Sequence, residues 1–219
     1  MGERGAARVD WKEQERVLTL EGEPVLSYTL SWPEIEAGGR AGRRISRYYA
    51  RLAQSWRDRW ERQVYWSACL DLAARREAAR PFTPWRGELS GEVALLEDGV
   101  LSLRFRGAET RGDGKASRVR WGDLWQVREG RPLPLGELLG GERGWRKRLW
   151  AALTRQGEER RQGGDCFLDP DWAEKVRPAR PLDHGCLTPE GLEVSLPQCL
   201  ASPAAEGCPV FVLPLREEK

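Results

Sequence analysis

The sequence predicts a single α+β domain, in which an antiparallel sheet packs against one long amphipathic helix and a second, shorter helix. Residues 43–80 contain neither Gly nor Pro and carry apolar side chains at three- and four-residue steps, which is typical of an amphipathic helix. Residues 24–32 alternate apolar and polar side chains, as a strand with one buried face does. Of the 219 residues, 40% are hydrophobic, which is enough for one core without a metal or disulfides.

The N-terminal strands are predicted at residues 16–21 and 24–32, joined by a turn at residues 21–23. One face of the second strand carries Val25, Ser27, Thr29 and Ser31. Proline cannot donate a hydrogen bond to a sheet, so we expect the chain to leave the sheet at Trp32-Pro33. Residues 1–15 are predicted to be a flexible N-terminal segment, and residues 16–217 to form the domain.

The long helix is predicted over residues 42–79. Its apolar stripe consists of Ile45, Tyr48, Tyr49, Leu52, Trp56, Trp60 and Val64. A straight helix of this length would extend about 55 Å at 1.5 Å per residue, which exceeds the width of a compact domain of this size. We therefore expect a bend or break near residues 67–72. The stripe itself is predicted to be covered by the sheet.

The rest of the chain reads as further strands and two helices. Strands are predicted at residues 91–96, 100–106 and 117–127, with an Asp98-Gly99 hairpin turn between the first two. Helices are predicted at residues 135–139 and 143–161, and a short turn at residues 170–175. Two final strands cover residues 186–196, which include a turn, and residues 209–215.

Charge and hydropathy indicate which classes of partner the protein is expected to bind. Lys and Arg total 36 against 34 Asp and Glu, so the net charge of +2 gives little attraction for phosphates. Arg side chains interleave with Trp along residues 55–66, but a buried stripe and a charged face explain this pattern without nucleic acid. Apolar runs of signal-peptide or membrane-spanning length are absent from the sequence. We expect a cytoplasmic protein with neither a membrane nor a nucleic acid as partner.

Catalytic motifs are missing from the sequence. It has one His, and it lacks a nucleophile elbow, a P-loop, a dinucleotide-binding glycine motif and a zinc-protease motif. We therefore predict no catalytic residue, no cofactor and no metal. Weak metal candidates are Cys166, His184, Cys186, Cys199 and Cys208, but their spacings of 17, 1, 12 and 8 intervening residues lack the short pairs of structural zinc sites. Asp165, Asp169 and Asp171 are interpreted as a solvated acidic loop.

Several segments together carry a family resemblance. They are residues 98–105 (DGVLSLRF), 130–139 (GRPLPLGELL), 186–197 (CLTPEGLEVSLP) and 200–214 (LASPAAEGCPVFVLP), preceded by residues 28–35 and 44–48. Over about residues 24–215 the chain resembles a bacterial family of unknown-function domains. That family includes the extracellular, lysozyme-binding domain of RsiV-type anti-sigma factors and the N-terminal domain of some peptidoglycan deacetylases.

The resemblance implies an RsiV-like fold. The loop at Arg111–Lys115 lacks the family's His, and the anchor of the anti-sigma factors is absent, so lysozyme binding is not carried over. We predict a non-catalytic binding or regulatory domain that recognises a protein or a cell-envelope ligand, through a helix–sheet cleft or an exposed sheet edge. The alternative is a metal-dependent or His-centred hydrolase-like enzyme, which would require His184, Cys186 and an acidic residue to converge in one pocket.

Overall fold

The computed structural model describes residues 7–36 and 39–215. The chain forms two compact units where the sequence predicts one domain over residues 16–217. Of these described residues, the first unit contains those up to Gly91 together with Arg106–Arg118, and the second contains Glu92–Phe105 together with those from Val119 onward. Among the described residues, helices are all too short or too polar to cross a membrane.

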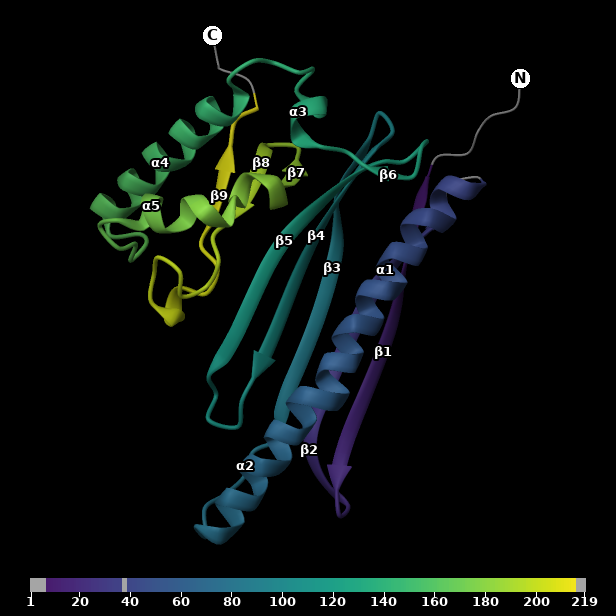
Figure 1. Cartoon of the computed structure of the whole chain (residues 1–219), viewed down its shortest axis with the longest axis vertical. Helices are drawn as coiled ribbons and strands as arrows, with labels where there is room; N and C mark the ends of the chain where they lie inside the picture. The colour runs from purple at the N-terminus through teal and green to yellow at the C-terminus, as the bar shows by residue number, and fades with distance from the viewer. Residues whose placement is uncertain (1–6, 37–38, 216–219) are drawn as a thin grey trace. The chain divides into compact units, whose positions relative to one another are not determined.

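A six-stranded sheet runs in the order β1-β2-β3-β4-β5-β6 (Figure 1). Its strands are β1 (Arg8–Leu20), β2 (Glu23–Glu36), β3 (Trp85–Glu97), β4 (Val100–Thr110), β5 (Ala116–Gln126) and β6 (Arg131–Pro132). The β1–β2 and β5–β6 pairs are antiparallel, but β2 and β3 are parallel. The prediction of an antiparallel sheet is therefore wrong. A long helix connects β2 to β3, and such a crossover brings the chain back to the end of the sheet where β2 began.

The N-terminal hairpin is longer than the sequence predicts. Strand β1 starts at Arg8, so residues 8–15, which were expected to be flexible, pair with β2. Strand β2 also continues through Pro33, which lies opposite Trp11, and the expected exit from the sheet at this proline is wrong. The register between β2 and β3 ends at Leu30. At Pro33, strand β2 therefore has β1 as its hydrogen-bonded neighbour on one side only, and a residue without an N–H is tolerated there.

The long helix consists of α1 (Arg40–Arg59), a π-helical segment (Trp60–Val64) and α2 (Tyr65–Glu77). The expected bend near residues 67–72 is wrong, because the departure from α-helical geometry lies at residues 60–64 instead. Most of the predicted apolar stripe is covered: Ile45, Tyr49, Trp60 and Val64 are buried. Tyr48 is the clearest exception and is 46% exposed.

Trp60 is completely buried and contacts three strands of the sheet. Its ring centroid lies 5.1 Å from that of Tyr28 on β2, and its Nε1 donates a hydrogen bond to Glu109 on β4 at 3.1 Å. A Cβ atom on Gly87 of β3 would come within 2.8 Å of the indole ring. Strand β3 therefore needs glycine at this position, because only a residue without a side chain lets the ring lie against the sheet.

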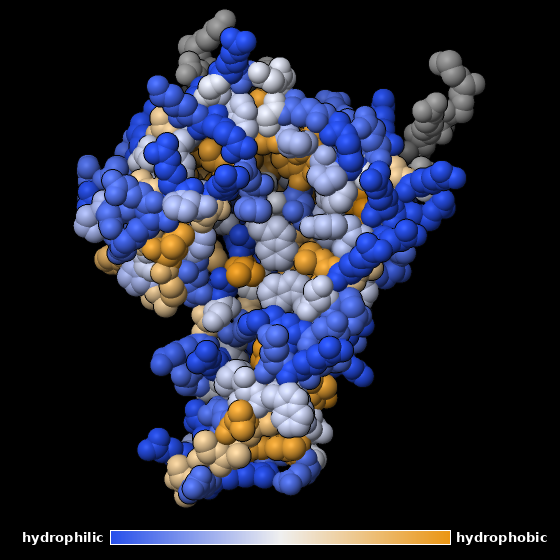
Figure 2. Space-filling model, in the orientation of Figure 1, coloured by the Kyte–Doolittle hydropathy of each residue, from blue (hydrophilic) through white to orange (hydrophobic). Residues whose placement is uncertain are grey.

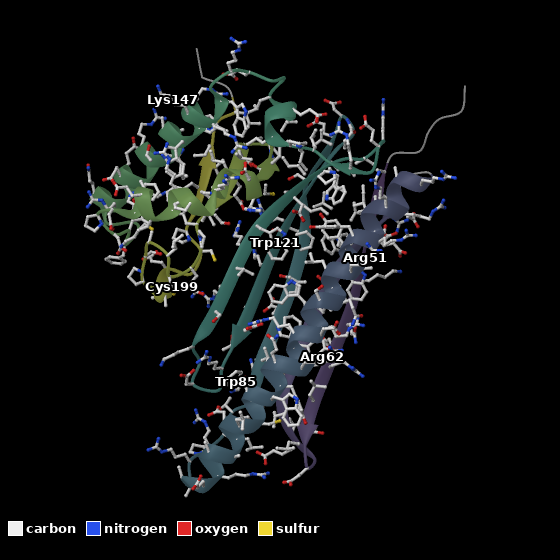
Figure 3. All side chains as sticks on the ribbon, viewed as in Figure 1. Arg51, Arg62, Trp85, Trp121, Lys147 and Cys199 are labelled. Carbon is white, nitrogen blue, oxygen red and sulfur yellow. The ribbon has the colours of Figure 1, made fainter. Side chains whose placement is uncertain are left out.

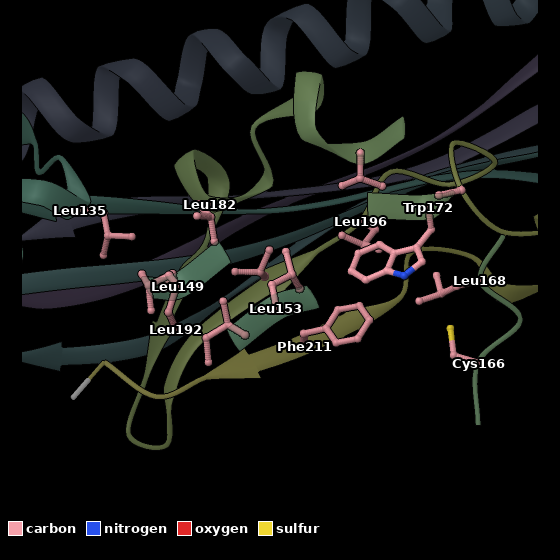
Figure 4. Close-up of a cluster of buried hydrophobic side chains, with 14 residues drawn as sticks. Leu135, Leu149, Leu153, Cys166, Leu168, Trp172, Leu182, Leu192, Leu196 and Phe211 are labelled. Atoms are coloured by element: carbon pink, nitrogen blue, oxygen red, sulfur yellow. The ribbon is translucent and has the colours of Figure 1, made fainter. Parts of the chain in front are cut away.

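The second unit has its own core (Figure 4). It contains α3 (Leu135–Leu138), α4 (Trp145–Gly163), α5 (Trp172–Val176) and a three-stranded antiparallel sheet of β7 (Cys186–Thr188), β8 (Gly191–Ser195) and β9 (Val210–Leu213). Leu149 and Leu153 of α4 belong to this core together with Trp172 and Phe211. The prediction that a shorter helix packs together with the long helix against one antiparallel sheet is therefore wrong, because the apolar side chains of α4 belong to this separate core.

Candidate binding site

A depression of about 270 Å³, lined mostly by polar and charged residues, lies on the face of the sheet away from the long helix. Side chains alternate along a strand. Tyr28 of β2 contacts Trp60 and Glu61 of the helix, so Ser27 and Thr29 face the other way. We call the depression the hydroxyl trough. The side chains that line it on this face are Glu13, Ser27, Thr29, Ser31, Arg86, Glu88 and Ser90.

The register of the strands explains the shape of the trough. Ser31 of β2 lies opposite Glu13 of β1, and Thr29 lies opposite Glu88 of β3. The central strand therefore carries short hydroxyl side chains, whereas its two neighbours carry long charged ones. Neighbouring strands are about 4.8 Å apart, so the two charged walls are separated by about 10 Å.

Three charged side chains line the trough. Glu13 and Glu88 supply two carboxylates and Arg86 supplies one guanidinium. Within residues 7–36 and 39–215, these three side chains have neither a hydrogen-bond nor an ion-pair partner, although many other Arg and Glu side chains are paired. The lining thus has an excess of negative charge beside a row of hydroxyls, which both donate and accept hydrogen bonds.

The opposite face of β2 is held in place by a network between strand and helix. Glu61 of the π-helical segment accepts hydrogen bonds of 2.6 Å from Tyr28 Oη and from Arg16 of β1. Burial acts to raise the pKa of Glu61, but the hydrogen bonds from Tyr28 and Arg16 outweigh it and lower this pKa. Burial, together with the hydrogen bond to Glu61, raises the pKa of Tyr28 to about 12.

The raised pKa of Tyr28 predicts a loss of stability in alkali. A group whose pKa is raised in the folded state contributes its full stability below the unfolded value of 10.0, and this contribution falls as the pH rises through about 12. We expect the stability advantage of the wild type over Tyr28→Phe to decline between pH 10 and 12, in urea titrations at each pH. The matched comparison is Tyr48→Phe, at an exposed tyrosine. An advantage of the wild type over Tyr28→Phe that is independent of pH would contradict the network.

A second polar cluster lies in the other unit and is fully paired. Glu193 of β8 is 8% exposed and accepts hydrogen bonds of 2.6 Å from Arg104 of β4 and from Arg120 of β5. Arg104 also donates to Glu92 at 2.9 Å. Because each charge has a partner of opposite sign, this cluster joins β3, β4, β5 and β8 within the second unit and offers a ligand no free group.

Cys186 lies beside this cluster, in a tightly packed position. Its Sγ is 3.4 Å from Ser102 Oγ, and a Cβ on Gly122 would come within 2.5 Å of the Cys186 Cα. Burial raises the pKa of the Cys186 thiol, so it is protonated at neutral pH. A buried, protonated thiol is neither a ready nucleophile nor a ready metal ligand.

The other weak candidates are dispersed. Cys166 is buried beside Glu206, which together with burial raises the pKa of this thiol. Cys199 is exposed, Cys208 is partly buried and His184 is exposed. Over the described part of the chain, no three His, Cys, Asp or Glu side chains lie close enough together to hold a metal ion. The structure therefore does not gather three of the five candidates into one site.

Comparison with known proteins finds solved structures with a similar fold. No family model matches the sequence, and no curated protein matches it. A solved structure of a DUF3298 family protein from Bacteroides fragilis superposes with a TM-score of 0.65 at 12% identity, and the match covers 97% of this chain and 92% of that one. The chain has the fold of DUF3298 proteins. A second such structure, from Pseudomonas aeruginosa, has a TM-score of 0.54 at 14% identity, covering 95% and 89%.

The DUF3298 fold supports the predicted resemblance to a bacterial family of unknown-function domains. At these identities the likeness concerns the fold alone. Neither solved structure is described as an anti-sigma factor or a deacetylase, so the finer resemblance to RsiV-type proteins stays a prediction. The fold is shared across both units, because the matches cover nearly the whole chain.

Proposed function

We propose that the chain is a non-catalytic binding domain, and that its ligand is an extended segment of a partner protein with a basic side chain that enters the hydroxyl trough. The observation that carries this proposal is the pair of unpartnered carboxylates, Glu13 and Glu88, on either side of a row of hydroxyls. A lysine or arginine placed between the walls would meet acceptors of opposite charge on both sides.

The dimensions of the trough suit a peptide better than a large cofactor. Its volume of about 270 Å³ lies just below the range of about 300–1,000 Å³ for small-molecule sites, so one or two side chains would fill it. Ser27, Thr29 and Ser31 would exchange hydrogen bonds with the main chain of the peptide. Arg86, at one end of the row, would donate hydrogen bonds to a carbonyl or carboxylate oxygen of the same segment.

The thiols support a binding role over a catalytic one. Cys166 and Cys186 are buried, and burial raises the pKa of each thiol. Neither supplies a thiolate at neutral pH, which is the form that acts as nucleophile. Glu193, the most buried carboxylate among the described residues of the second unit, is neutralised by two arginines rather than directed at a free space.

The proposal is tested with four labelled peptides, nine residues long, that have a Gly-Ser background and a central Lys, Arg, Glu or Ala. Fluorescence anisotropy should show the Lys and Arg peptides binding at least about tenfold more tightly than the Glu peptide. This corresponds to about 1.4 kcal/mol, the scale of one charge-assisted hydrogen bond. Equal binding of all four peptides, or of none, would contradict a basic ligand in the trough.

A trough-filling variant locates the binding. Thr29→Trp places a large ring between the two charged walls and should abolish binding of the Lys peptide, and Glu13→Gln with Glu88→Gln should weaken it about tenfold or more. The matched control is Ser117→Trp, at an exposed position on β5 outside the lining of the trough. If Thr29→Trp bound the Lys peptide as the wild type does, the ligand would have to lie elsewhere.

A further inference from the structure

An apolar stripe on the outer face of α2 has no partner within the described chain. Trp66 is 62% exposed and Leu70 is 72% exposed, and the exposed Ala73 and Ala74 follow them at helical spacing. The opposite face of α2 is buried against β2 and its neighbours. Figure 2 shows apolar colouring gathered over α2. Contiguous apolar surface of this kind marks interaction sites.

The two ends of the stripe are bordered by side chains of opposite charge. Arg62, in the π-helical segment just before α2, precedes Trp66 by four residues, and Glu77 follows Ala73 and Ala74 by one turn (Figure 3 labels Arg62). Both side chains are exposed, and neither has an ion-pair or hydrogen-bond partner in the part of the chain that the structure describes. Along the helix the order is therefore cation, indole ring, leucine, two alanines, anion.

This order is complementary to itself when reversed. Arg62 and Glu77 are equally far from a point between Cys69 and Leu70, and so are Trp66 and Ala73. In an antiparallel pair of α2 helices, Arg62 would face Glu77 of the second copy, and the large ring of Trp66 would face a small alanine. Leu70 would lie beside Leu70 of the second copy. A two-fold interface requires this kind of self-complementarity, since each surface patch must fit its own copy.

We propose that α2 is a homodimer interface and that its occupant is α2 of a second copy of this chain, packed antiparallel. The inference is independent of the proposed function, because the hydroxyl trough lies on the other face of the sheet in the same unit. The stripe consists of two large apolar side chains and two alanines, a small set beside the roughly 20–30 residues that each partner of a standard interface contributes. The dimer should therefore be weak, with a dissociation constant on the order of tens of micromolar.

The test is sedimentation velocity of the full chain over a protein concentration series that spans this dissociation constant. The wild type should shift from monomer to dimer across the series. Arg62→Glu alone and Glu77→Arg alone each create two like-charge pairs across the axis and should weaken the dimer about tenfold or more. The control is Arg51→Glu, which reverses an exposed charge on α1, away from the stripe, and should dimerise as the wild type does.

Mixing the variants tests the antiparallel register directly. An equimolar mixture of Arg62→Glu and Glu77→Arg restores opposite charges at both ends of the axis and should form heterodimers, and the double variant should recover self-association. Leu70→Glu should abolish the dimer in every background. A wild type that stays monomeric throughout the series would overturn the proposal. So would dimers that persist unchanged in the single charge variants and in Leu70→Glu, because association would then use another surface.

Discussion

Replacing Trp60 with alanine is expected to lower the free energy of unfolding by about 3–5 kcal/mol. The ring is completely buried, it packs against Tyr28 and Trp56, and it lies against Gly87 of β3. Its removal leaves a cavity between helix and sheet and also removes the donor to Glu109. The same reasoning predicts that Gly87→Ala destabilises the first unit, because its new Cβ would push the ring away from the sheet.

The matched control for Trp60→Ala is Trp66→Ala, six residues further along the same helical run but 62% exposed. Its effect should remain within about 0.5 kcal/mol. Urea titrations in dilute protein, where the proposed α2 dimer is dissociated, measure both variants. Equal losses from Trp60→Ala and Trp66→Ala would mean that the sheet does not cover Trp60 as described.

Glu193→Leu is expected to cost about 3–5 kcal/mol in the second unit, because it leaves the partly buried Arg120 without its counter-charge and Arg104 with Glu92 alone. Glu193 is paired with Arg104 and Arg120, and the side chains of these arginines are only 18% and 20% exposed. Repulsion between the two guanidiniums adds to the cost of burying each one. Denaturant unfolding, followed by circular dichroism, measures the loss.

The control for Glu193→Leu is Glu174→Leu, an exposed position on α5 of the same unit that should change stability little. A triple variant that also replaces Arg104 and Arg120 by methionine should recover most of the loss, because it removes every buried charge of the trio at once. If Glu193→Leu were as mild as Glu174→Leu, the cluster would have to be solvated rather than buried.

Much of the secondary structure could be predicted from local patterns, but the pairing of β2 with β3 could not. The helical spacing of apolar residues predicted the long helix and the burial of Trp60, and the Asp98-Gly99 turn predicted the β3–β4 hairpin. The partner of β2 depends on where a helix of almost forty residues returns the chain, and no local pattern encodes that. The expected exit from the sheet at Pro33 was wrong for a related reason. Whether a strand can contain a proline depends on which neighbouring strands pair with it at that position.

The candidate binding site could be predicted from the sequence only in part. The alternation of Ser27, Thr29 and Ser31 revealed a hydroxyl face on one strand, but the charged walls come from β1 and β3, whose registers are set by tertiary pairing. The cluster around Glu193 was missed altogether. A carboxylate between Leu192 and Val194 in an apolar strand was a usable signal, since a buried charge needs a partner. Its partners, Arg104 and Arg120, could not be chosen from so many arginines.

The most direct measurement is hydrogen–deuterium exchange of the wild-type chain with and without the Lys peptide. Peptide in the hydroxyl trough should slow exchange in residues 27–31 of β2 and 86–90 of β3, and this protection should vanish in Thr29→Trp. Protection confined to other segments, or retained in full by Thr29→Trp, would show that this face of the sheet is not where the protein binds.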